Sequence, residues 1–155
     1  MKLTLTAILV AVLGITPCIA NDGQFSDILG ECWKGHDHPQ MSACVQSRAA
    51  EARARLSSVV AELRKGISNS EESAGYSRAG ALAALDASIK AFQEYRTRQC
   101  AAVFAVASMG NGAEDNKLAC EAQLDLERTA QLSAVLWWYR GDSSPNTSLE
   151  RTREG

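Results

Sequence analysis

Five cysteines constrain the fold of this 155-residue chain more than any other feature of its sequence. Four of them, Cys32, Cys44, Cys100 and Cys120, are separated by 12, 56 and 20 residues. Structural zinc sites usually draw their ligands from close pairs such as C-x2-C, and no pair here is that close. An even set of widely spaced cysteines in an exported chain indicates disulfides. We therefore expect two disulfides, provided that the chain is exported and that Cys18 does not join the set.

The first twenty residues have the order of a secretory signal peptide. Lys2 is their only charged residue, an apolar stretch at 3–15 follows, and the small Ala20 precedes polar residues. The apolar stretch is shorter than the roughly 20 residues of a membrane span. We expect cleavage after Ala20, which removes Cys18 and leaves four cysteines. Two alternatives remain open, namely a retained N-terminal anchor and a lipoprotein processed before Cys18 and lipidated there.

Length and charge indicate one soluble domain after cleavage. Removing residues 1–20 takes away only Lys2, which leaves 15 Lys and Arg against 18 Asp and Glu, a formal net charge of −3. Nucleic-acid-binding proteins normally carry a basic patch, so we expect no nucleic-acid partner. We also expect a helical domain at 21–141 without a transmembrane segment, a disordered polar tail at 142–155, and a periplasmic or cell-envelope location.

Apolar residues recur at helical spacing through the middle of the chain, and no strand-like alternation of useful length is present. The fold class is therefore expected to be all-α, a small antiparallel bundle of about three long helices. Ser42 is a suitable N-cap for the first of them, which Gly66 is expected to end. The expected helices lie at 42–65, 78–109 and 114–140, with a short helix or turn at 24–32, a loop at 33–41 and a linker at 66–77.

The geometry of the last two long helices indicates how the cysteines pair. The Gly110-Asn111-Gly112 sequence is typical of a turn, and helices joined by such a turn lie antiparallel. Cys100 lies ten residues before this turn and Cys120 eight residues after it. At about 1.5 Å of rise per residue, both lie roughly 12–15 Å from the turn and face each other. This predicts the disulfides Cys100–Cys120 and, by elimination, Cys32–Cys44.

Residues 92–100, FQEYRTRQC, resemble the W-x-x-Y-R-D-x-x-C motif of the LprI-type lysozyme inhibitor family. Tyr95, Arg96 and Cys100 match this motif, whereas Phe92 replaces the usual Trp and Thr97 the usual Asp.

The second motif of that family, C-x3-L-T-x2-R-x3-L, also has a counterpart here. Cys120, Leu124, Arg128 and Leu132 stand at the same spacing, and Asp125 takes the place of the usual Thr. The resemblance extends from residue 32 to about residue 136.

The resemblance implies a small, exported, disulfide-bonded helical protein. The member that names the family is an envelope lipoprotein that binds and inhibits lysozyme, so the implied partner is a lysozyme or another envelope protein. The matched residues are expected to be structural, with Arg96 and Arg128 paired to internal acceptors. These residues are Phe92, Tyr95, Arg96, Leu124, Arg128 and Leu132.

The residue pattern indicates no catalytic set and no metal site, so we expect no enzyme, no cofactor and no metal. No Ser–His–Asp or Cys–His set is evident, and the disulfides leave no free cysteine nucleophile. His36, Asp37 and His38 form the only histidine cluster. Adjacent loop positions rarely converge on one ion without a further ligand, so we interpret this cluster as a solvated loop.

Two functions remain open at this point. The first is occlusion of a lysozyme cleft, with loop 33–41 and its exposed Trp33 and His36 as the expected contact, because Trp is a common hot-spot residue. The common secreted lysozymes are basic, which suits an acidic partner. The second function is a structural or adaptor module of the bacterial envelope with no enzyme target.

The predicted processing can be checked by mass spectrometry of the exported protein. We expect a chain that begins at Asn21, lacks Cys18 and is four mass units lighter than its reduced form, because each disulfide removes two hydrogens. A lipid-modified peptide that begins at Cys18 would contradict this cleavage site and support the lipoprotein alternative.

Overall fold

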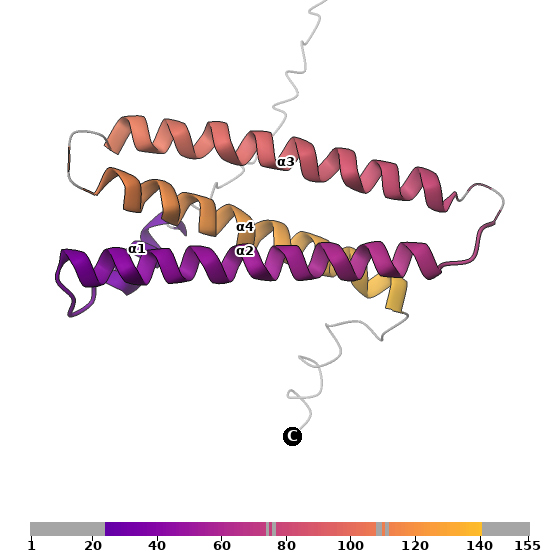
Figure 1. Cartoon of the computed structure of the whole chain (residues 1–155), viewed down its shortest axis with the longest axis horizontal. Helices are drawn as coiled ribbons and strands as arrows, with labels where there is room; N and C mark the ends of the chain where they lie inside the picture. Colours follow the sequence, from indigo (N-terminus) through magenta and orange to yellow (C-terminus); the bar gives the residue numbers. More distant parts are fainter. Residues whose placement is uncertain (1–23, 74, 76, 108–109, 111, 141–155) are drawn as a thin grey trace, which may run out of the picture.

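A computed structural model describes residues 24–73, 75, 77–107, 110 and 112–140, and its four elements are all helices (Figure 1). They are α1 (Gln24–Trp33), α2 (His38–Asn69), α3 (Arg78–Ala107) and α4 (Ala113–Arg140). The predicted all-α class is confirmed, and the segment that was expected to form a short helix or turn is a fourth helix. The predicted signal peptide, Cys18 and the tail at 142–155 lie outside the described residues.

Helix α2 begins at His38, four residues before the expected N-cap at Ser42. Asp37 is the true N-cap, because its Oδ1 accepts a hydrogen bond from the Gln40 backbone N–H at 3.0 Å. The Gln40 side-chain oxygen accepts one from the Asp37 N–H at 3.3 Å, which completes a capping box. Pro39 was wrongly interpreted as a loop residue, since proline is tolerated in the first turn of a helix.

The connection between α1 and α2 is therefore only residues 34–37, which we call the α1–α2 turn. Gly35 adopts a φ of +75° there, a conformation that side chains with a Cβ rarely adopt. The chain thus reverses sharply at this end of the bundle.

Gly66 does not end α2, which continues to Asn69. It lies where α4 approaches, and a Cβ added to Gly66 would lie 3.3 Å from the Cβ of Tyr139. The glycine therefore permits close packing between two helices, and the sequence pattern alone suggested a helix stop instead.

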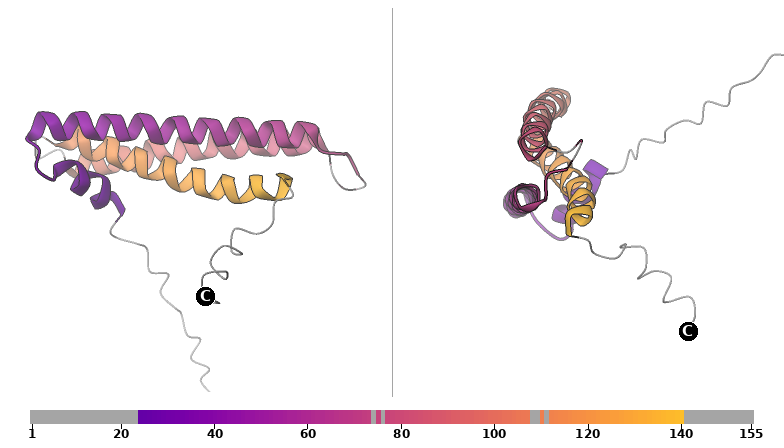
Figure 2. Two further views of the ribbon diagram at one scale, coloured as in Figure 1. Left: turned by 90° about the horizontal axis from the view of Figure 1, so that it is seen from below. Right: turned by 90° about the vertical axis from the view of Figure 1, so that its right-hand side faces the viewer.

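Helix α4 packs against both other long helices, and the three form a triangle when the bundle is seen end-on (Figure 2). It runs parallel to α2 and antiparallel to α3, and it contacts each of the other three helices. Helix α1 packs against α2 and α4 at the end of the bundle where α2 begins (Figure 2). Helices α2 and α3 contact each other much less than either contacts α4.

Three apolar clusters hold these helices together. The first joins α1, α2 and α4 around Cys32 and Val45. The second joins α2, α3 and α4 at the far end, around Leu63 and Leu85. The third lies between α3 and α4 around Cys100. Burial of apolar surface in these clusters is the main stabilising term expected for such a bundle.

Both predicted disulfides are confirmed. Cys32–Cys44 joins α1 to α2 with a Cα–Cα distance of 5.5 Å, and Cys100–Cys120 joins α3 to α4 at 5.6 Å. Within the described ranges, no helix combines the length and apolar composition that crossing a membrane requires.

Truncation of the core at Leu63 tests the packing of α2 against its neighbours. Leu63 is 2% exposed, so Leu63→Ala should lower the free energy of unfolding by about 2–5 kcal/mol through lost burial and a residual cavity. Val106→Ala is the matched control, because Val106 is 84% exposed and its truncation should change stability by less than about 0.5 kcal/mol. Urea unfolding measures both, and equal effects would contradict the assigned core.

Candidate functional site

A groove of about 560 Å³ opens at the end of the bundle that carries the α1–α2 turn. We call it the end groove. It is formed by α1, the start of α2 and the start of α4. Its lining includes Leu29, Trp33, His38, Met41, Asp115 and Asn116. Most of the exposed lining is apolar, which is typical of sites that bind a ligand or a partner side chain.

Trp33 forms one wall of the end groove and is 57% exposed. It is the last residue of α1 and follows Cys32, whose fully buried side chain is covalently bonded to Cys44 on α2. The indole therefore projects from a backbone that the disulfide holds in place. A large exposed aromatic side chain on a fixed backbone is suited to contact another protein.

Asp115 supplies a buried carboxylate to the same groove. Its Oδ1 accepts a hydrogen bond from the Ser42 hydroxyl at 2.7 Å, and its Oδ2 lies 3.6 Å from Nε2 of His38. Asp115 also lies in the first turn of α4, where the helix dipole favours negative charge. The contact with Ser42 has no local sequence signal, because Ser42 and Asp115 are 73 residues apart.

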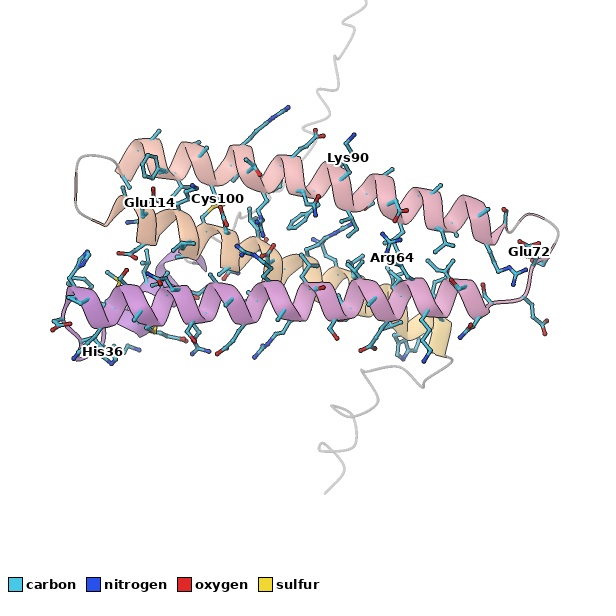
Figure 3. All side chains as sticks on the ribbon, in the orientation of Figure 1. His36, Arg64, Glu72, Lys90, Cys100 and Glu114 are labelled. Atoms are coloured by element: carbon cyan, nitrogen blue, oxygen red, sulfur yellow. A yellow bond between two sulfur atoms is a disulfide. The ribbon has the colours of Figure 1, made fainter. Side chains whose placement is uncertain are left out.

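The two histidines of the α1–α2 region have separate surroundings. His36, near the same end of the bundle as Glu114 (Figure 3), places Nδ1 3.1 Å from the Cys32 carbonyl oxygen, where it donates in the matching tautomer. His38 lines the end groove, whereas His36 does not. Asp37 caps α2. Among the described residues, no group of three or more His, Cys, Asp or Glu side chains is placed to hold a metal ion.

Arg96, on α3, forms the centre of a charged cluster with α4. Its Nη1 donates to both carboxylate oxygens of Asp125, at 2.8 and 2.6 Å, and its Nη2 lies 3.5 Å from Glu121. Arg53 of α2 also lies 3.5 Å from Glu121. Asp125 is only 1% exposed, so its negative charge depends on Arg96 for compensation.

Arg128, the second motif arginine, has neutral partners. Its Nη2 donates to the Ser88 hydroxyl and its Nη1 to the side-chain oxygen of Gln131 at 3.0 Å. The guanidinium lies 5.8 Å from the centroid of the Phe92 ring, within the range of a cation–π contact. Its buried Nε has no hydrogen-bond partner among the described residues. Arg128 therefore links α4 to α3 without a carboxylate.

The remaining motif residues divide into inward and outward positions. Leu124 is buried beside the Cys100–Cys120 disulfide, and Phe92 packs against that cluster. Leu132 belongs to the far-end cluster with α2. Tyr95 is 53% exposed on α3 and does not line the end groove.

The buried Arg96–Asp125 pair can be compared with the exposed pair of Arg64 and Asp86. Asp125→Ala leaves the Arg96 guanidinium with Glu121 at 3.5 Å as its remaining carboxylate and should cost roughly 2–3 kcal/mol of folding free energy. Asp86→Ala removes a carboxylate that is about half exposed and should cost about 0–1 kcal/mol. Denaturant titration measures both values, and similar costs at the two sites would contradict a structural role for Arg96.

A sequence model of the family described as lysozyme inhibitor LprI matches residues 32–132, which is more than half of the chain. The match begins at the first bonded cysteine and contains both disulfides, both arginines and Asp115. No curated protein and no solved structure matches the chain. The agreement of the family match with the bonded cysteines and the motif positions shows that this chain belongs to the LprI lysozyme inhibitor family.

Proposed function

We propose that this protein is an exported inhibitor that binds a lysozyme through the α1–α2 turn and the end groove and thereby covers the cleft of the enzyme. The observation that carries this proposal is the exposed indole of Trp33 beside an apolar groove. Family membership supports lysozyme as the class of target.

Preorganisation of this end of the bundle supports the choice of contact surface. The Cys32–Cys44 disulfide fixes α1 on α2, and the capping box of Asp37 and Gln40 fixes the start of α2. A turn that is ordered before binding loses little conformational entropy in the complex. Trp33 can then bury a large apolar surface at small entropic cost, which is the usual property of an interface hot spot.

The proposed mechanism is steric. A glycoside hydrolase must admit a polysaccharide to a cleft that holds two catalytic carboxyl groups. The α1–α2 turn carries exposed Lys34 and His36 beside Trp33. A cation and a ring nitrogen at the tip of the turn suit a cleft that contains carboxylates. In such a complex the substrate is excluded, and the chemical groups of the enzyme need not change.

Export to an oxidising compartment fits the two disulfides, because such bonds persist outside the cytosol. Each closes a short loop and should stabilise the fold by about 3 kcal/mol through the unfolded chain. Together with the signal-like residues 1–20, they support a periplasmic or envelope location, where lysozyme is encountered.

Truncation of Trp33 tests the proposed contact. Trp33→Ala should raise the inhibition constant for a sensitive lysozyme by about 30-fold or more, as expected when an interface hot spot is lost. Tyr95→Ala is the matched control, because Tyr95 is an aromatic residue of similar exposure on another helix. Lysis of bacterial cell walls, followed by turbidity, gives the constants, and thermal unfolding shows whether both variants remain folded.

The proposed function would be contradicted if the wild-type protein inhibited neither basic secreted nor bacterial-type lysozymes and formed no complex with them in gel filtration. Recovery of other envelope proteins in its place would favour an adaptor role. A larger effect of Tyr95→Ala than of Trp33→Ala would move the contact surface to α3.

A further inference from the structure

We propose that the end groove receives one arginine or lysine side chain of the partner protein. Leu29, Trp33 and Met41 contact the aliphatic stem, and the carboxylate of Asp115 binds the cation. This inference deepens the proposed function by giving the chemistry of the partner's contact, and it rests on that function only for the identity of the partner as a lysozyme.

The shape and chemistry of the groove match a long basic side chain. Its apolar walls come from α1 and the first turn of α2, and its single carboxylate comes from the first turn of α4. Arginine and lysine combine an apolar stem with a charged end, and they bury the stem where the charge can reach a polar group. The exposed Trp33 ring also offers a face for a cation.

Asp115 retains capacity to bind a cation. A carboxylate has about four acceptor positions, and the hydroxyl of Ser42 occupies one of them on Oδ1. Nε2 of His38, the ion-pair candidate for Asp115 among the described residues, lies 3.6 Å from Oδ2, which is beyond hydrogen-bond distance. A buried carboxylate that lacks a strong cationic partner gains much from a charge-assisted hydrogen bond.

The side chains that line the groove favour a cation over an anion. Among the described residues that line it, Asp115 is the only carboxylate, His38 is the only other titratable group, and no lysine or arginine is present. The neighbouring Glu114 lies outside the lining and faces Lys117 at 4.0 Å. The groove between α2 and α3 differs, because its Arg53 and Arg96 already contact acidic residues. The end groove therefore combines apolar walls with a carboxylate that has no lysine or arginine partner among the described lining residues.

The direct experiment titrates the wild-type protein with N-acetyl-arginine amide and follows the Trp33 indole N–H by NMR. N-acetyl-norleucine amide is the matched probe, because it has an unbranched apolar side chain and no charge. We expect the arginine probe to shift the Trp33 resonance and to bind about tenfold more tightly than the norleucine probe. This comparison needs no variant and so does not depend on the folding of a mutant.

Two variants with the same change in net charge then test whether the partner protein binds at the groove. Asp115→Asn should remove the preference for the arginine probe and raise the Kd for a bound lysozyme by about tenfold. Glu114→Gln makes the same change in net charge one residue earlier, at an exposed position, and should alter both values by less than about twofold. Circular dichroism and thermal unfolding check that Asp115→Asn remains folded.

The outcomes separate this inference from the proposed function. If lysozyme binds but the arginine probe leaves Trp33 unchanged, or the norleucine probe binds equally well, the inference is overturned and the proposed function stands. If the arginine probe binds and no lysozyme does, the groove chemistry is supported and the proposed function fails. A Trp33 shift that depends on protein concentration, without any probe, would identify a second copy as the occupant and overturn the inference.

Discussion

The Cys100–Cys120 bond is the constraint on which the position of α3 depends. Of the residues in α3, only Leu85 and Cys100 are fully buried, whereas α2 buries seven, so α3 packs less deeply than α2. The bond anchors one part of α3 to α4, and the far-end cluster around Leu85 anchors the other. Between these two points, Ile89 and Phe92 pack partly buried, beside the polar contacts that Arg96 and Ser88 make with α4. The disulfide therefore fixes the position of α3 along α4. For α2, a stripe of buried apolar residues fixes the position instead.

Arg96 lies beside two positions, 97 and 125, at which the chain departs from the sequence pattern of its family. The pattern places an acidic residue directly after the arginine and a threonine on the facing helix, whereas here Thr97 and Asp125 occupy those positions. Asp125 is the residue that Arg96 contacts, and the Thr97 hydroxyl donates to the Gln93 carbonyl on its own helix. The carboxylate that compensates Arg96 thus comes from the opposite helix, and the buried pair links α3 to α4.

The cysteine spacing and the helical periodicity were sufficient to predict the two disulfides and the three long helices. They did not predict the start of α2, because the capping box of Asp37 and Gln40 overrides the loop preference suggested by Pro39.

The cysteine spacing and the helical periodicity also could not predict the end groove. Ser42, His38 and Asp115 meet only because α2 docks beside the start of α4, and such a long-range contact has no local sequence signal. The exposure of Trp33 was predicted from its place next to Cys32 and is confirmed at 57%. The separation of His36 from the groove that Trp33 lines could not be predicted, because it depends on how the three helices meet.

The order of the disulfides along the chain has a consequence for biogenesis. Each cysteine is bonded to its immediate neighbour in the set, so the two covalent loops are consecutive and neither encloses the other. A chain that crosses a membrane N-terminus first presents its cysteines in the order 32, 44, 100 and 120. An oxidase that joins each pair as it emerges produces the native pattern directly, and shuffling of mixed disulfides is not needed. In a chain exported in this way, the first loop can therefore close before Cys100 and Cys120 become available to compete for its cysteines.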